Sequence, residues 1–215
     1  MKTIPLRDAV EMIPSGAIVM IGGYFGVGVP ENIIDELVRQ KIGELTIVAN
    51  DAGSPGAGIG KLVHAGLVRR FIVSQIGLNP EAQKAMLNGA IEVDLVPQGT
   101  LAERIRAAGY GLGGVLTAMG AGALAEDGKS KLEMDGKTFL VEKALRADFA
   151  LLQAFMADGV GNLAYAMTAG TFNPLMAMAA RTVIVETENI VPVGVIAPDH
   201  VMTPGPLIDY VVAKD

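Results

Sequence analysis

Short apolar runs, rich in β-branched residues and followed by a turn and an amphipathic segment, repeat along this chain. Ala17–Ile21 and Leu45–Ala49 are two such runs, and their continuous apolar character is typical of strands buried on both faces of a parallel sheet. Between them, Glu31–Lys41 carries apolar residues at helical spacing. This order of strand, turn, helix and strand is a βαβ unit, and it predicts an α/β fold.

The same alternation predicts the remaining elements. Strands are expected at Arg70–Ser74, Glu92–Val96, Phe149–Ala154 and Thr182–Glu186, and helices at Met1–Pro14, Ile59–His64, Glu81–Asn88, Thr100–Ala108 and Asn173–Arg181. Thr100 and Glu103 have the spacing of a capping box. The glycine-rich segment Gly109–Gly122 is expected to be a loop, and Val191–Tyr210 to form short strands interrupted by proline.

Asp135-Gly136 lies between two short alternating runs, which is a strong signal for a hairpin. We therefore predict a small antiparallel insertion at Ala123–Leu145. The sequence has no internal repeat and no linker-like segment. Its 215 residues then predict one domain, residues 1–215, with an open, mainly parallel sheet flanked by helices.

Composition narrows the function classes. Lys and Arg number 17 against 23 Asp and Glu, a net charge of −6, which argues against a nucleic-acid partner. There is no cysteine, and His64 and His200 are the two histidines, so thiolate chemistry is excluded and no metal site is expected. Apolar runs end well short of the ~20 residues that a membrane helix needs. No membrane association is expected, and without a secretory signal pattern the cytoplasm is the expected location.

Two glycine-rich segments are candidate binding loops. Gly109–Gly114 fits G-x-G-x-x-G, but it follows a predicted helix instead of a strand, so a dinucleotide site there is weakly indicated. Gly22–Pro30 has four glycines and follows the first buried strand. Ligands bind outside the carboxyl ends of strands in open α/β sheets, and free amides near a helix N-terminus can hold an anion. A purely structural tight turn is the alternative.

Several longer segments carry a family resemblance. They are Ile18–Pro30, Asn50-Asp51, Ser74–Pro80, Val96–Arg106, Phe172–Met176 and Thr203-Pro204-Gly205. In this order they resemble family I coenzyme A-transferases, and among them the A (alpha) subunit of the acetate or butyrate–acetoacetate type. The resemblance implies an α/β domain related to the sugar-phosphate isomerase fold. It also implies transfer of CoA between a short-chain acyl-CoA and a free carboxylic acid, through a covalent intermediate on an enzyme glutamate.

The resemblance also implies site residues. The nucleophilic glutamate of two-subunit members lies in a Ser-Glu-Asn-Gly-like motif of the beta subunit, and this chain has no such motif. A beta-subunit partner is therefore expected, with CoA as a substrate and no separate cofactor. Glu31 and Glu103 are more simply helix-end carboxylates. The residues expected to line the acyl or pantetheine region are Gly22, Gly23, Tyr24, Phe25, Gly26, Val27, Gly28, Phe172 and Asn173.

Gln98 and Asn50 follow buried strands, where a side-chain amide could polarise a thioester carbonyl; a satisfied turn amide is the alternative for each. Arg104 and Arg106 could meet CoA phosphates, or form a solvated helix face or a subunit interface. The chain departs from the family pattern at Ser15, Tyr24, Gln75, Leu78, Met119 and Thr171. Several of these exchanges are toward apolar or small residues, which points to a different, more apolar acyl group. A stand-alone isomerase or hydrolase and a non-catalytic nucleotide-binding subunit are the alternatives.

Overall fold

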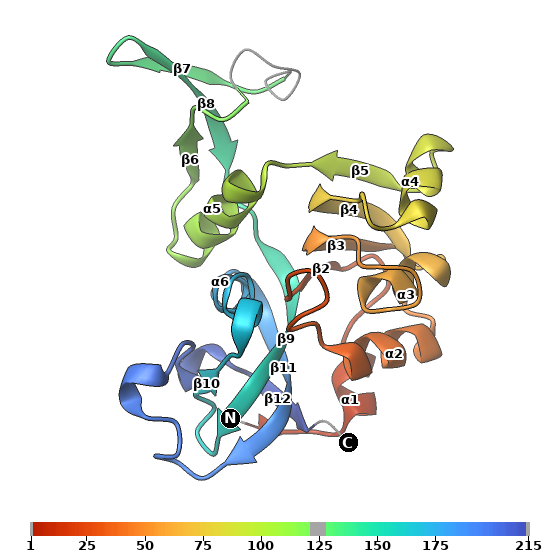
Figure 1. Ribbon diagram of the computed structural model, residues 1–215, viewed down its shortest axis with the longest axis vertical. Helices are drawn as coiled ribbons and strands as arrows, with labels where there is room; N and C mark the ends of the chain where they lie inside the picture. Colours follow the sequence, from red (N-terminus) through yellow and green to blue (C-terminus); the bar gives the residue numbers. More distant parts are fainter. Residues whose placement is uncertain (1, 121–127, 214–215) are drawn as a thin grey trace.

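The computed structural model describes residues 2–120 and 128–213, and these contain a nine-stranded sheet and a separate three-stranded sheet (Figure 1). The strands of the large sheet are β1 (Lys2–Thr3), β2 (Ile18–Ile21), β3 (Leu45–Asp51), β4 (Val68–Gln75), β5 (Glu92–Leu95), β9 (Ala147–Asp158), β10 (Leu163–Ala164), β11 (Ala180–Val191) and β12 (Tyr210–Ala213). Their order is β1-β12-β11-β9-β2-β3-β4-β5, with β10 beside β9. All pairs along this order are parallel and the β10–β9 pair is antiparallel, which confirms the predicted fold class.

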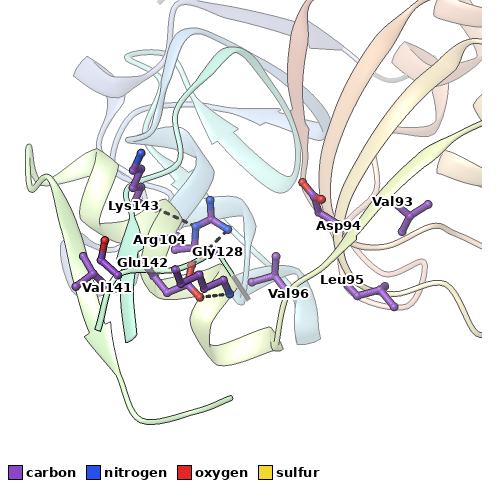
Figure 2. A pocket seen from close by; sticks show the side chains of 11 residues that line it. Val93, Asp94, Leu95, Val96, Arg104, Gly128, Val141, Glu142 and Lys143 are labelled. Atoms are coloured by element: carbon purple, nitrogen blue, oxygen red, sulfur yellow. Dashed lines mark hydrogen bonds and ion pairs between the residues drawn. The ribbon is translucent and has the colours of Figure 1, made fainter. Parts of the chain in front are cut away.

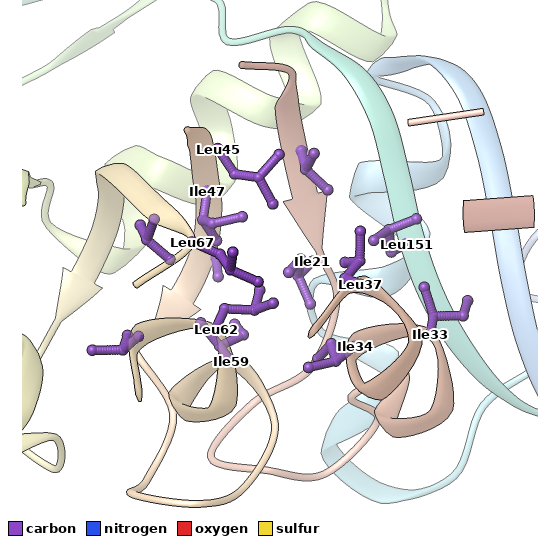
Figure 3. Packing of buried hydrophobic residues seen from close by; sticks show 14 of the residues in the cluster. Ile21, Ile33, Ile34, Leu37, Leu45, Ile47, Ile59, Leu62, Leu67 and Leu151 are labelled. Carbon is purple, nitrogen blue, oxygen red and sulfur yellow. The ribbon is translucent and has the colours of Figure 1, made fainter. Parts of the chain in front are cut away.

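Helices cover both faces of the large sheet. They are α1 (Leu6–Glu11), α2 (Glu31–Gln40), α3 (Ile59–His64), α4 (Pro80–Leu87), α5 (Gln98–Gly109) and α6 (Asn173–Ala177). Side chains alternate along each strand, so Ile21 packs with α2 and α3 on one face (Figure 3), while Met20 packs with α5 and α6 on the other. Burying each large aliphatic side chain contributes roughly 1.5–3 kcal/mol. None of the described helices is both long and apolar enough to span a bilayer.

The small sheet consists of β6 (Gly114–Thr117), β7 (Lys131–Met134) and β8 (Lys137–Lys143), in the antiparallel order β6-β8-β7. It projects from the rest of the molecule next to α5 (Figure 1). Asp135 and Gly136 both have positive φ, as the predicted hairpin turn requires. The predicted insertion at Ala123–Leu145 therefore contains a hairpin, although its residues up to 127 lie outside the described ranges.

Within the expected loop Gly109–Gly122, the structure contains strand β6, so that prediction is wrong for this part. Gly114 lies against β8: a Cβ built on it would be 2.4 Å from the carbonyl oxygen of Glu142. Here glycine permits close approach of two strands instead of forming a loop. The pairing partner, β8, is distant in sequence, which is why local composition did not reveal the strand.

Other predicted boundaries also need correction. Met1–Pro14 is not one helix, because Lys2–Thr3 pairs with β12 as strand β1 and α1 begins after Pro5. The helix predicted at Asn173–Arg181 ends at Ala177, since the chain enters β11 at Ala180 to pair with β9. Val191–Tyr210 holds the 3-10 helices η3 (Pro198–His200) and η4 (Gly205–Leu207) where short strands were expected.

The capping box predicted from Thr100 and Glu103 is not formed. Helix α5 has Pro97 at its N-cap, and no described side chain caps it. Thr100 lies inside the first turn, and Glu103 pairs with Arg106 one turn later at 2.6 Å. The Glu103 carboxylate, which a capping box would need as an acceptor at the helix N-terminus, is therefore paired with Arg106 instead.

Candidate functional site

The carboxyl ends of β2, β3 and β4 lie at one edge of the sheet, because these strands are parallel neighbours (Figure 1). There β2 leads into the loop Gly22–Gly28, β3 ends with Asn50 and Asp51, and β4 ends with Ser74 and Gln75. Asp51 and Gln75 are in register. Open parallel sheets bind ligands outside this edge, so it is the candidate functional site.

The loop Gly22–Gly28 is a tight turn closed by its own backbone. The amide of Tyr24 donates to the carbonyl of Val27 at 2.9 Å, and the amide of Val27 donates back at 3.1 Å. Phe25, at the tip, has φ of +49° and a side chain that is 50% exposed. A left-handed conformation costs a non-glycine residue ~1 kcal/mol, and such strain concentrates at functional sites. Contacts with neighbouring residues must therefore hold Phe25 in this conformation.

Asp51 is one of the groups that hold the tip. Its Oδ2 accepts hydrogen bonds from the backbone amide of Phe25 at 3.0 Å and from Nδ2 of Asn50 at 2.8 Å. Its Oδ1 accepts one from the amide of Gly53, also at 3.0 Å. The carboxylate thus joins the loop after β2 to the loop after β3. Asp51 was not among the predicted site residues, although an Asp that ends a buried strand shortly before Gly53 was a usable signal.

Asn173 holds the base of the same loop. Its side chain is fully buried, with Nδ2 donating to the carbonyls of Gly28 at 3.1 Å and Ala169 at 3.0 Å. Its Oδ1 accepts from the amide of Gln153 on β9 at 3.1 Å. A Cβ on Gly28 would be 2.4 Å from that of Ala169, so the loop packs directly against the segment before α6. Asn173 thus connects the loop to β9 on the buried side of the loop.

Phe172, the other residue predicted from the same segment, lies in the core. Its side chain is 2% exposed and belongs to the cluster that includes Leu101 of α5 and Met176 of α6. Phe172 and Asn173 are therefore neighbours at the start of α6 with different contacts: Phe172 packs in the core, whereas Asn173 bonds to the glycine loop. The role of Phe172 toward substrate remains a prediction, and its packing places it behind the site in this chain.

Asn50 is buried and makes hydrogen bonds through both ends of its carboxamide. Nδ2 donates to Asp51, and Oδ1 accepts from the hydroxyl of Ser74 at 3.1 Å. The same hydroxyl is 2.7 Å from the backbone carbonyl of Asn50. These bonds connect the ends of β3 and β4 and orient the Asp51 carboxylate toward Phe25.

Gln98 differs from Asn50 because its side chain is exposed. It is the first residue of α5, directly after β5 and Pro97. No described residue hydrogen-bonds its carboxamide, which borders a hollow of about 400 Å³. An exposed amide donor at the start of an uncapped helix can polarise a carbonyl oxygen that enters this hollow.

The two glutamates near this edge are engaged in ion pairs. Glu31, at the start of α2, accepts the amide of Gly58 at 2.9 Å and pairs with Lys61 at 2.7 Å. Burial alone lowers the pKa of Lys61, but hydrogen bonds to Asp35 and Glu31 outweigh it and hold that pKa above its ordinary value. For Glu103, the hydrogen bond from Arg106 holds the carboxyl pKa below its ordinary value. Within the described ranges, no three His, Asp or Glu side chains gather as a metal site would require.

The second glycine-rich segment, Gly109–Gly114, has the wrong context for a dinucleotide loop. It runs from the end of α5 into β6, so it is followed by a strand where a dinucleotide loop would open a helix. Gly109 instead permits helix packing: a Cβ there would be 2.6 Å from the Cβ of Met178. The geometry gives no support to nucleotide binding at this segment.

Known proteins resemble this chain along nearly its whole length. The family described as Coenzyme A transferase matches residues 4–214. The acetate CoA-transferase subunit alpha of Escherichia coli K12 is 45% identical over 213 residues, 99% of this chain and 97% of its own. The acetoacetyl-CoA:acetate/butyrate CoA transferase alpha subunit of Clostridium acetobutylicum is 47% identical over 213 residues, with 99% and 98% covered.

Solved structures show the same fold. An acyl-CoA transferase of E. coli O157:H7, in a thioester complex with CoA, superposes with a TM-score of 0.87 at 22% identity. This chain is covered to 99% and spans 47% of that longer chain. Glutaconate coenzyme A-transferase of Acidaminococcus fermentans gives 0.84 at 20% identity, with 99% and 75% covered. The fold, the match along nearly the whole sequence and the likeness to alpha subunits lead to one conclusion: this chain belongs to the coenzyme A transferase family.

Proposed function

We propose that this chain is the alpha subunit of a two-subunit enzyme that moves CoA between a short-chain acyl-CoA and a free carboxylic acid. Acetate, butyrate and acetoacetate are the acids that the names of its relatives suggest. The observation that carries the proposal is that the exposed Gln98 amide and the clamped glycine loop both follow strands at the same edge of the sheet. CoA enters as a substrate. We also propose a cytoplasmic location, which the absence of cysteine permits.

The chemistry follows from the family. A glutamate carboxylate of the beta subunit attacks the thioester carbonyl, the C–S bond breaks, and CoA leaves as a thiolate. The thiolate then attacks the glutamyl carbonyl of the mixed anhydride, which releases the first acid and forms a glutamyl thioester. A second acid reverses these two steps. Each step passes through a tetrahedral oxyanion, so donors positioned for that oxygen contribute strongly.

In this chain, we assign Gln98 to the developing oxyanion and the loop Gly22–Gly28 to the acyl and pantetheine wall. Asn50 acts in support, because its amide orients Asp51, which in turn holds the amide of Phe25. Asn173 positions the loop from below. Glu31 and Glu103 are ion-paired, which supports a nucleophile supplied by the partner.

The exposure of apolar side chains at this edge also supports a partner. Phe25 is 50% exposed, Leu78 is 51% exposed and Met167 is 81% exposed. Met167 begins the turn that leads to Ala169, which packs on the glycine loop, and it has φ of +51°. Exposed apolar surface beside a site marks a region that another chain covers. We therefore propose that the beta subunit closes the site over the loop tip.

A CoA-transfer assay tests the proposal. Acetyl-CoA with acetoacetate or butyrate is supplied to this chain alone and to its complex with the beta subunit. Transfer by the complex and not by the chain alone is expected. Gln98→Ala should lower kcat of the complex ~100-fold, the usual effect of losing an oxyanion donor. Gln40→Ala, at the far end of α2, is the control that should keep full activity.

Other outcomes point to the alternatives. Activity of the isolated chain would contradict the shared site and favour a stand-alone isomerase or hydrolase. Tight binding of a nucleotide by the isolated chain, without transfer by the complex, would favour a nucleotide-binding subunit. Full activity of the Gln98→Ala complex would remove Gln98 from the site and leave the family assignment intact.

A further inference from the structure

The small sheet β6-β8-β7 gathers large apolar side chains on one of its faces. Residues that pair in register across antiparallel strands lie on the same face, and so do alternate residues along one strand. By this rule one face holds Leu116 of β6, Leu132 and Met134 of β7, and Phe139 and Val141 of β8. We call it the arm face.

The described parts of the chain leave the arm face open. The small sheet projects from the body of the molecule next to α5 (Figure 1). Phe139 is partly buried, whereas the other members of the arm face are between 37% and 45% exposed. Single apolar residues are normal on a protein surface, but a contiguous apolar patch marks a region that another molecule covers. The arm face is therefore a candidate interaction surface.

The opposite face of the same strands makes its contacts within the chain. Glu142 is buried there between Lys129 at 2.5 Å and Arg104 at 3.8 Å (Figure 2). Leu140, which alternates with Glu142 along β8, is fully buried. The arm face is thus the side of this sheet that is available to a partner.

The arm face reaches the candidate site at Leu116. This residue lines the hollow of about 400 Å³ that Gln98 borders, together with Met119, which is 64% exposed. The proposed transfer requires a carboxylate of the beta subunit beside Gln98. A subunit that approaches Gln98 from outside therefore meets this end of the arm face, so its position favours the beta subunit as the occupant.

Charge distinguishes the beta subunit from a second copy of this chain. Lys137 and Lys143 lie on the arm face, because they alternate with Phe139 and Val141 along β8. The described strands β6, β7 and β8 place no Asp or Glu on this face, and no described residue forms an ion pair with either lysine. Two arm faces packed together bring lysines toward lysines, which is repulsive. A complementary surface is apolar and is flanked by carboxylates.

We propose that the arm face is a docking surface for the beta subunit, and that it binds an apolar strip of that subunit flanked by Asp or Glu side chains. The small sheet then holds the partner beside the site that the two subunits share. This inference rests on the proposed function, because it names where the partner of that site binds.

The test measures how tightly this chain and the beta subunit associate. The purified complex is diluted, and its Kd is determined by analytical ultracentrifugation. Leu132→Gln and Met134→Gln keep side chains of similar size on the arm face but make them polar. Each should raise Kd at least about tenfold, as expected for an apolar residue inside an interface.

Two controls separate docking from folding and from catalysis. Leu87→Gln makes the same exchange at an 82% exposed leucine on α4, which packs on the other face of the large sheet, and should leave Kd unchanged. Circular dichroism of each variant should match that of the unmodified chain. At concentrations far above Kd, the Leu132→Gln and Met134→Gln complexes should recover full kcat, which a residue that contacts substrate would not allow.

Lys137→Glu tests the chemistry of the occupant. A carboxylate at this position faces the carboxylates of the partner, so Kd should rise about fivefold at low salt. The difference from the unmodified complex should shrink at high salt, because ions screen exposed charges. An unchanged or lower Kd for Lys137→Glu would contradict an acidic rim on the partner.

The remaining outcomes differ in what they overturn. Unchanged Kd values for Leu132→Gln and Met134→Gln would overturn the docking surface. Self-association of this chain that both variants abolish, with unchanged binding of the beta subunit, would assign the arm face to a second copy and would also overturn the proposal. Absence of any complex between the unmodified chain and the beta subunit would instead contradict the proposed function.

Discussion

The side-chain oxygen of Asn173 occupies the space beside Gly22 in which a larger residue would need its Cβ. A Cβ built on Gly22 would be 1.8 Å from Asn173 Oδ1, the atom that accepts the amide of Gln153. We predict that Gly22→Ala lowers the free energy of unfolding by about 3 kcal/mol, because the buried carboxamide must move and lose bonds. Urea unfolding followed by circular dichroism measures the change.

A neighbouring glycine provides the control for that substitution. Gly26 has φ of +85°, but no described atom lies within 4 Å of the position that a Cβ would take, so Gly26→Ala should cost only the conformational ~1 kcal/mol. The double variant Gly22→Ala with Asn173→Ala should be more stable than the sum of the two single effects, because the clash is gone. Additive effects would show that Asn173 is not what restricts Gly22.

The carboxylate of Asp51 provides a second prediction. Asp51→Ala leaves the amides of Phe25 and Gly53 without their acceptor, so the loop tip loses the contact that holds its left-handed conformation. We expect kcat/KM of the complex to fall at least about tenfold and hydrogen exchange to accelerate in the loop Gly22–Gly28. Asp199→Ala, an exposed change in η3, is the control. Lost activity with unchanged loop exchange would contradict the positioning role.

A third prediction concerns Glu142, whose side chain is 5% exposed between Lys129 at 2.5 Å and Arg104 at 3.8 Å (Figure 2). Glu142→Ala leaves two cations without a counter-charge, a change that costs about 3 kcal/mol in buried pairs. We expect faster hydrogen exchange in β6 and β8, and little change in β2–β4. Asp199→Ala in the exposed η3 should alter exchange in neither region; an equal response to both variants would exclude a specific role for Glu142.

The fourth prediction is a pH dependence of stability. A hydrogen bond from Arg39 holds the pKa of Glu36 below its ordinary value of 4.5, and Gln40 adds to this although burial opposes it. A carboxyl with a lowered folded-state pKa stabilises the fold above its unfolded-state pKa, and the contribution disappears as pH falls through the folded-state value. Stability should therefore decrease below pH 4.5, and Glu36→Gln should weaken that decrease. Urea unfolding across the acid range tests this, with the exposed Glu44→Gln as control.

Local sequence patterns predicted the elements whose ends are set by neighbouring residues. Helix α3 spans the predicted Ile59–His64, because Gly58 precedes it and Gly66 follows it. The buried strands could be predicted because each is a continuous apolar run in the sequence. Strands β1 and β6 escaped prediction because they are short and their partners β12 and β8 are remote in sequence.

The site shows the same division. The positions of the glycine loop and of Gln98 at strand ends could be predicted, because each follows a recognisable strand; their roles toward substrate stay predictions. The bond between Asp51 and Phe25 joins residues 26 positions apart, and the bond between Asn173 and Gly28 joins residues 145 positions apart. No local pattern encodes such pairs, so the contact of Asp51 with Phe25 and the contact of the buried Asn173 with Gly28 could not be foreseen, although the strand-end position of Asp51 could have marked it as a candidate.

The attachment of the small sheet has a mechanical consequence. Arg104 donates from Nε to the carbonyl of Lys143 at 2.9 Å, so the base of β8 is fastened to α5. Gln98 belongs to the same helix, ~9 Å along its axis from Arg104. The base of the hairpin and the helix that begins with Gln98 are therefore joined directly by a hydrogen bond, so a partner bound to β7 and β8 would contact the same unit that carries the Gln98 amide.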